Sequence, residues 1–198
     1  VAYFSPVFNG FQAVGAYIPE EGTADGDAWS LAGFYDNGPI YVGLGYEQVN
    51  ENFFPGGTGD ESTSWRLTGS YKFGGGFRVV GFYQDVSDDL NTSGVDWDVW
   101  GIGGSYKFGN NKVKAQFYDR DDRDDINESG ASAWSVGFDH NFSKRTKLYV
   151  TYADVDNDDN ATFTINSQGF DQGAASTGAG MEAGGDSTGL AIGVSHKF

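Results

Sequence analysis

The chain has 198 residues, with 28 acidic and 12 basic side chains and a formal net charge of −16. This balance argues against a nucleic-acid-binding protein, because contacts to phosphates need an excess of lysine and arginine. The absence of cysteine excludes disulfides and thiolate metal sites. No run of about 18 consecutive apolar residues occurs, which excludes a transmembrane helix. Abundant glycine and 16% aromatic residues favour short strands and tight turns.

Apolar and polar residues alternate along most of the chain. In 62–73, for example, Trp65 and Leu67 alternate with Arg66 and Thr68, so a strand there has one apolar and one polar face. The same two-residue period is clear in 112–121, whereas the faces of the second and sixth strands are ambiguous. We expect eleven strands, over about 1–5, 11–18, 27–36, 39–49, 62–73, 77–87, 95–108, 112–121, 132–142, 146–156 and 186–198.

A short motif repeats where predicted strands end. Ser-Tyr-Lys-Phe-Gly at 70–74 recurs at 105–109, which is 35 residues later. A unit of about 35 residues fits two strands of roughly ten residues, one tight turn and one longer loop. Short connections near 6–10, 37–38, 74–76, 109–111 and 143–145 alternate with long ones near 19–26, 50–61, 88–94, 122–131 and 157–185. Bases cluster at the short turns and acids at the long loops, as in membrane barrels with turns at one rim and loops at the other.

The last nine residues form an amphipathic strand that ends on an aromatic residue. Val194, His196 and Phe198 share one face with Leu190 and Ile192. This ending resembles the C-terminal signature by which the barrel-assembly machinery recognises bacterial outer-membrane proteins. The fold class predicted is therefore all-β, a transmembrane antiparallel β-barrel.

Three segments resemble one family. Residues 1–11 read Val-Ala-Tyr-Phe-Ser-Pro-Val-Phe-Asn-Gly-Phe, 143–149 read Ser-Lys-Arg-Thr-Lys-Leu-Tyr, and the chain ends on His-Lys-Phe. These stretches are similar to the trimeric general porins of Gram-negative bacteria. The resemblance implies a homotrimer in the outer membrane. We expect outer-membrane lipid and lipopolysaccharide as further partners, the latter through divalent ions at the acidic loops, and no cofactor. It also implies a water-filled channel for passive diffusion of ions and small hydrophilic solutes.

The number of strands differs from that of a complete barrel. Bacterial single-chain barrels have an even number of strands, and an open sheet of eleven would leave two unpaired edges in lipid. Aligned from the C-terminus, the strands correspond to the last eleven of about sixteen. We therefore expect residues 1–198 to be a single β-barrel domain that lacks its N-terminal part.

Inward-facing polar side chains are the candidates for lining the pore. Arg66 is the base nearest the middle of its strand, whereas other bases lie near a rim. Acidic loops should concentrate cations at the channel mouth over about one Debye length, ~8 Å at physiological salt, which predicts a weak cation preference. The candidate pore-lining residues are Arg66, Arg78, Lys72, Lys114, Tyr41, Gln116 and Tyr149.

Other functions have weaker support from the sequence. An outer-membrane lipid hydrolase would need a catalytic histidine, but His140 and His196 both fall in the repeated rim motif. A closed adhesin or anchor barrel is a further alternative. The acidic run 154–159 has acids where a calcium loop has them, but Asp159 replaces the required glycine and Ile165 the final glutamate. We therefore expect loose binding of divalent ions by the acidic loops and no dedicated metal site. Gly101–Gly104 lies within a strand and indicates close packing or a trimer contact.

Overall fold

The computed structural model describes residues 1–19, 26–50, 61–88, 95–124, 126–165 and 182–198. The eleven expected strands are present, and each begins and ends within two residues of its expected bounds. One short 3-10 turn, η1 (Gly74–Gly76), separates two of them. The strands are β1 (Ala2–Phe4), β2 (Phe11–Ile18), β3 (Ala28–Asn37), β4 (Ile40–Asn50), β5 (Glu61–Lys72), β6 (Phe77–Asp88), β7 (Trp97–Phe108), β8 (Asn111–Arg120), β9 (Ala131–Asn141), β10 (Thr146–Asn157) and β11 (Ser187–His196).

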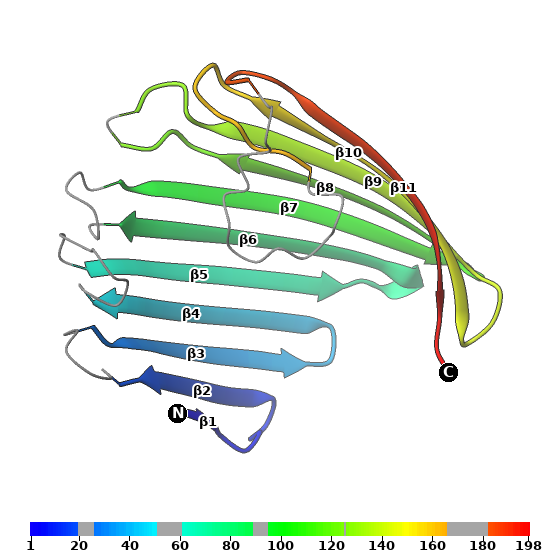
Figure 1. Cartoon of the computed structure of the whole chain (residues 1–198). Coiled ribbons are helices and arrows are strands. Elements are labelled where there is room, and N and C mark those ends of the chain that lie inside the picture. Colours follow the sequence, from blue (N-terminus) through cyan, green and yellow to red (C-terminus); the bar gives the residue numbers. More distant parts are fainter. Residues whose placement is uncertain (20–25, 51–60, 89–94, 125, 166–181) are drawn as a thin grey trace. The chain divides into compact units, whose positions relative to one another are not determined.

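The strands form one sheet in chain order, from β1 to β11 (Figure 1). The described strand pairs are antiparallel, which confirms the all-β antiparallel part of the predicted fold. β1 and β11 stand at the two ends of this order, so closure into a barrel of about sixteen strands stays a prediction. Among the described residues, no helix is long and apolar enough to cross a membrane.

Short turns join the strands at the ends where the sequence predicts them. In the turn that directly precedes β2, Gly10 has a positive φ of 88°. A Cβ there would stand 2.8 Å from the carbonyl oxygen of Asp36. Glycine fits because it adopts this backbone conformation without a side chain to collide. The Asp36 amide donates to the Gly10 carbonyl at 2.8 Å, which ties the turn to the adjacent hairpin.

Contacts divide the chain into two compact units. The first comprises Val1–Tyr71, Gly81–Trp100 and Arg123–Asp125, and the second comprises Lys72–Val80, Gly101–Asp122 and Ile126–Phe198. The prediction of a single barrel domain over 1–198 stays a prediction.

In the first unit, the register gives the sheet one apolar and one polar face. Leu31 pairs with Tyr46, and Tyr46 pairs with Trp65, so these side chains share the apolar face. The opposite, polar face carries Ser30, which pairs with Glu47, which pairs with Ser64. The register also settles the ambiguous β2, because it pairs Phe11 with Tyr35 and Tyr17 with Trp29 and so places them on the apolar face.

The second unit has the same construction. Val113 pairs with Phe138, Phe138 with Val150, and Val150 with Ile192, which makes a continuous row on the apolar face. One residue along the strands, Lys112 pairs with Asp139, Asp139 with Tyr149, and Tyr149 with Gly193 on the polar face. Successive residues of β8, β9 and β10 therefore lie on opposite faces, as the two-residue period of 112–121 predicts for β8.

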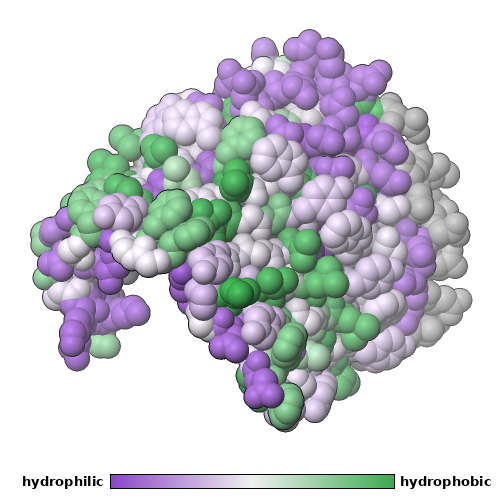
Figure 2. All heavy atoms as spheres, turned by 180° about the vertical axis from the view of Figure 1, so that it is seen from behind, coloured by the Kyte–Doolittle hydropathy of each residue, from purple (hydrophilic) through white to green (hydrophobic). Residues whose placement is uncertain are grey.

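The sheet buries almost no apolar side chain. Among the described residues, Ala28 and Ala161 are the buried hydrophobic ones, whereas Leu31, Ile102 and Ile192 are more than half exposed. Apolar side chains, shown in green, are exposed on the surface in Figure 2. A water-soluble monomer rarely exposes so many contiguous apolar residues, so these faces need an apolar environment.

Candidate functional site

The polar face of the second unit carries an ionic group centred on Asp139. The Lys114 ammonium lies 2.9 Å from one carboxylate oxygen of Asp139, and the Lys147 ammonium lies 3.7 Å from the other. The Asp139 side chain is 8% exposed, whereas the lysines are 39% and 38% exposed. Lys112 is opposite Asp139 in the register. Two bases therefore pair with one buried acid and a third lies opposite it in the register, so this part of the face carries a net positive charge.

Tyr149 and Gln116 lie on the same face. The Tyr149 ring covers Gly193 on β11, at a position where any Cβ would collide with the ring. The Lys147 ammonium lies 5.8 Å from the centre of this ring, within the range of a cation–π contact. Gln116 is exposed and pairs with Ser135 in the register. The structure thus brings three predicted residues, Lys114, Gln116 and Tyr149, to one polar surface.

Within the Gly101–Gly104 run of β7, Gly103 packs closely against its neighbours. A Cβ at Gly103 would stand 3.2 Å from the carbonyl oxygen of Ala115 and 3.3 Å from the Cβ of Gln116. It would also stand 3.3 Å from a methyl group of Val80. A larger side chain here would crowd three neighbours at once. The trimer contact that was the alternative for this run stays a prediction.

The polar face of the first unit holds Arg66 in a fixed position. The Arg66 Nε donates to the Gln84 side-chain oxygen at 2.9 Å, a second guanidinium nitrogen contacts the same oxygen, and the guanidinium carbon lies 5.7 Å from the centre of the Phe82 ring. Tyr41 pairs with Ser70 on this face. Gln84 and Phe82 were not predicted as site residues, because the alternation of β6 is ambiguous.

Lys72 and Arg78 lie at the short-turn end, on either side of η1. Lys72 is the last residue of β5 and Arg78 the second of β6, and both are exposed. Lys107, Lys112 and Lys147 are also within two residues of a short turn. The predicted concentration of bases at the short turns is therefore present. Many acids predicted for the long loops fall on 20–25, 51–60, 89–94 and 125, which are outside the described residues.

The two histidines have structural partners at the same strand ends. His140 Nδ1 lies 2.7 Å from the side-chain oxygen of Asn111, and His196 Nδ1 lies 3.0 Å from the hydroxyl of Thr146. Each imidazole also packs edge-on against an aromatic ring two residues away, Phe142 or Phe198, at 4.8 and 5.0 Å between centroids. These contacts position the imidazoles and the neighbouring aromatic rings at the rim.

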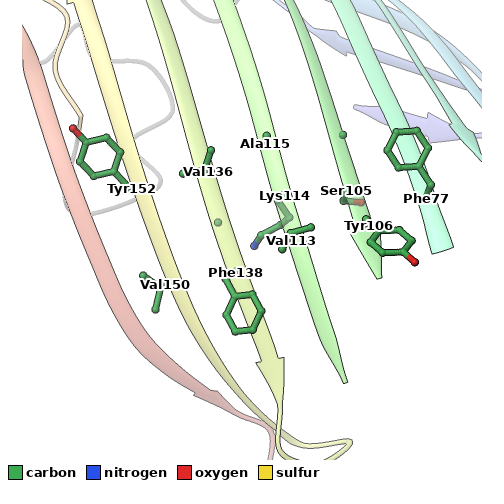
Figure 3. Close-up of a pocket in the computed structure, with 12 residues that line it drawn as sticks. Phe77, Ser105, Tyr106, Val113, Lys114, Ala115, Val136, Phe138, Val150 and Tyr152 are labelled. Atoms are coloured by element: carbon green, nitrogen blue, oxygen red, sulfur yellow. The ribbon is translucent and has the colours of Figure 1, made fainter. Parts of the chain in front are cut away.

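A shallow depression of about 600 Å³ lies in the second unit (Figure 3). Phe77, Tyr106, Ala115, Phe138 and Tyr152 are among the residues that line it. The register places these β8, β9 and β10 residues on the apolar face. The depression therefore belongs to the surface that needs an apolar environment.

The loop that follows β8 is organised by one carboxylate. Asp122 accepts hydrogen bonds from the amides of Glu128, Ser129 and Gly130 at 3.0, 2.7 and 2.8 Å. Hydrogen bonds from the Glu128 and Gly130 amides lower the pKa of Asp122 below its usual value. Among the described residues, no group of three or more His, Cys, Asp or Glu side chains is arranged to hold a metal ion.

The strand dimensions and the two faces define a class of protein. β3 to β11 contain ten to twelve residues each, and about 9 to 11 residues suffice for a tilted strand to cross a bilayer. An antiparallel sheet of such strands, apolar on one face and polar on the other, is the construction of outer-membrane β-barrel proteins.

Comparison with known proteins agrees with this class. A family model described as Gram-negative porin matches residues 1–160, and the chain therefore belongs to this family of the bacterial outer membrane. The chain is 32% identical over 209 residues to outer membrane porin protein 32 of Delftia acidovorans, covering all of this chain and 56% of that protein. The chain thus spans about half the length of the curated relative it matches.

Solved structures show the same fold. A refined porin structure is similar with a TM-score of 0.64 and 21% identity, over 78% of this chain and 55% of that one. A loop-deletion mutant of OmpT, an outer membrane protein of Vibrio cholerae, is similar with a TM-score of 0.62 and 18% identity, over 78% and 56% of the two chains.

Proposed function

We propose that this chain forms part of the wall of a water-filled outer-membrane channel for passive diffusion of ions and small hydrophilic solutes. The observation that carries the proposal is the separation of faces: apolar residues such as Leu31 and Val136 are exposed on one face, and Lys114, Asp139 and Lys147 interact on the other. A lipid-facing surface must be apolar, whereas charged side chains need water or a partner.

The polar faces would act on solutes through position and charge. Arg66 is held by Gln84 and Phe82 in the first unit, and the Asp139 group presents two ion-paired lysines in the second. Such side chains bias which ions enter a water-filled lumen, and lumen size limits which solutes pass. In this proposal the seven predicted residues line the pore, and no bond is made or broken.

Completion of the barrel is part of the proposal. β1 and β11 present unpaired edges in this sheet, and unpaired backbone groups in lipid cost several kcal/mol each. We propose that further strands, to about sixteen in all, pair with these edges. The intact mass of the heat-denatured polypeptide from its source membrane tests this, because about sixteen strands require a mass well above 21.3 kDa.

Planar-bilayer recording of the natural polypeptide tests the channel function. Large, stable single-channel conductance steps that scale with salt concentration are expected. A closed adhesin or anchor barrel, or an outer-membrane lipid hydrolase, should give no such steps. Release of fatty acid from phospholipid vesicles, together with the absence of steps, would instead support the hydrolase.

The proposed partners follow from the same family. We propose a homotrimer in contact with lipid and lipopolysaccharide, which unheated and heated electrophoresis of the extracted protein should distinguish by a threefold difference in mass. Val194 and His196 lie on the apolar face of β11, and Phe198 is fully exposed beyond its end. We propose these three residues as the signal for the barrel-assembly machinery, so deletion of Phe198 should lower the amount of protein in the outer membrane.

A further inference from the structure

The residues that follow β10 fold back over the polar face of β11. The Ile165 amide donates to the Ser187 hydroxyl at 3.1 Å, and an Ile165 methyl group lies 3.2 Å from the position of a Cβ at Gly189. Gly189 and Gly193 face the same side of β11, since they are four residues apart, and the polar-face residue Tyr149 covers Gly193. Ile165 therefore lies on the polar face and can approach the sheet because Gly189 has no side chain.

Phe163 lies over the same polar face at β8, which is two strands from β10 in the sheet. The Arg120 guanidinium carbon lies 5.0 Å from the centre of the Phe163 ring. Arg120 alternates in phase with Lys112 and Lys114 along β8, which places it on the polar face as well. The segment Ala161–Ile165 thus extends over the polar face between β8 and β11, at the ends of these strands opposite the short turns.

Asn157 fixes this segment in place. Its side chain is buried, donates to the carbonyl oxygens of Phe163 at 2.8 Å and Gly185 at 2.6 Å, and accepts from the Phe163 amide at 2.8 Å. One side chain therefore joins the strand end to both described ends of the connection. The Gly184 amide also donates to the Ala161 carbonyl at 3.0 Å.

The adjoining loop supports the segment from the other side. The Asn160 amide donates to the Glu128 carbonyl at 2.7 Å, and the Asn160 side chain donates to the Asn127 carbonyl at 2.9 Å. Ala161 is 3% exposed, and the four residues after it are partly buried. With hydrogen bonds at both flanks, the segment is held against the sheet and does not project from it.

We propose that Ala161–Ile165 is a fixed constriction element on the channel wall. Its side chains Phe163 and Ile165 limit conductance at the end of the channel where the long loops lie. This inference rests on the proposed function, because the polar face borders the lumen only if the protein forms a channel. Two apolar side chains on a polar wall reduce the water-filled cross-section and offer ions no polar contact. The element should therefore slow larger hydrophilic solutes more than small ions.

Cysteine labelling of the natural polypeptide in planar bilayers tests the proposal. The 198 residues contain no cysteine, so Ile165→Cys introduces a defined thiol. A cationic methanethiosulfonate reagent applied to open channels should lower the conductance in steps. The matched control is Ile192→Cys, on the apolar face of β11, the strand that Ile165 contacts. It should show no change because its thiol faces lipid. Unchanged conductance of a labelled Ile165→Cys channel would overturn the proposal, whereas the absence of any wild-type channel would overturn the proposed function itself.

A disulfide tests the position of the segment separately from its effect. The Ile165 Cβ lies 3.8 Å from the position of a Cβ at Gly189, within the range of about 3.5–4.5 Å for disulfides. The double variant Ile165→Cys with Gly189→Cys should form a disulfide on oxidation, and oxidised channels should conduct as reduced ones do. The control pair is Ile165→Cys with Ala191→Cys. Ala191 is the next residue after Gly189 on the same face of β11, so this pair should be too far apart to oxidise. Failure of the first pair to oxidise in correctly assembled protein, or a fall in conductance on its oxidation, would contradict the proposal. If that pair does not assemble, the labelling of Ile165→Cys alone decides.

Discussion

The Lys114 ammonium and the Asp139 carboxylate form an ion pair of 2.9 Å across neighbouring strands, and Lys147 approaches the same carboxylate at 3.7 Å from the other side. One nearly buried acid therefore holds two partly exposed bases that come from different strands. Their positions depend on Asp139, because long lysine side chains otherwise sample many rotamers. This arrangement makes the local charge of the polar face adjustable through a single residue.

Replacement of Asp139 by asparagine should shift ion selectivity toward anions. The change removes one negative charge from a group of three lysines and leaves the side chain close to its original size. We expect the reversal potential in a salt gradient to move toward that of an anion-selective channel. Glu128→Gln removes the same charge from an exposed loop and should have a smaller effect, since exposed charges are screened within ~8 Å. Equal shifts for the two variants would contradict the assigned role.

Arg66→Gln should shift the reversal potential toward cations, because it removes a base from the polar face. Gln84→Leu keeps the Arg66 charge but removes the oxygen to which the guanidinium donates. We expect Gln84→Leu to give a smaller shift in the same direction as Arg66→Gln. Lys72→Gln, at the rim, serves as the control with the same loss of charge. A shift from Lys72→Gln as large as that from Arg66→Gln would mean that the position of a base along the strand has no influence on ion selectivity.

Gly193→Val should destabilise the sheet, because any Cβ there would collide with the Tyr149 ring. The Tyr149 ring would have to move aside at a cost of about 1 kcal/mol, the low end of overpacking, which should lower the midpoint of guanidinium unfolding in micelles. Adding Tyr149→Ala should restore most of the loss, since the second change removes the ring. Gly33→Ala is the control, because a Cβ at Gly33 meets nothing within 4 Å. Without rescue in the double variant, the loss at Gly193 would have another cause.

The loop after β8 should loosen in acid. Hydrogen bonds to the charged carboxylate lower the pKa of Asp122 in the folded protein, so its stabilising effect is complete above the unfolded value. The effect should disappear as the pH falls through the lowered pKa, that is, below 3.8. Hydrogen exchange of the Ser129 and Gly130 amides, corrected for intrinsic rates, should therefore lose protection in this range. Asp122→Asn should show weaker protection with no such pH dependence.

The strands could be predicted because each carries its own signal. The two-residue period of β5, β8, β9 and β10 gives both their extent and their faces. β6 carries apolar residues on both sides, with Val80 and Phe82 alternating with Val79 and Tyr83, so its faces are undefined until its partners are known. The 5.1 Å contact of Tyr83 with Trp65 and the contact of Phe82 with Arg66 settle them.

The segment after β10 could not be predicted. Asn157 lies within an acidic run that resembles part of a calcium loop, and nothing in the sequence distinguishes it from its neighbours. Its role comes from backbone groups at Phe163 and Gly185, and the second of these is 28 residues away. The alternation of apolar and polar residues along β9 is enough to put Asp139 on the polar face, but its two lysine partners come from β8 and β10 and depend on the register.

The near absence of buried apolar residues also determines how this protein can be studied. In the described part of the chain, Ala28 and Ala161 are the buried hydrophobic residues, so the usual second layer of secondary structure has no counterpart among these residues. Lipid tails take the place of that layer, so the stability of the fold depends on the lipid or detergent that surrounds it. An unfolding free energy measured in micelles therefore belongs to the protein and detergent together, and comparisons between variants need the same amphiphile at the same concentration.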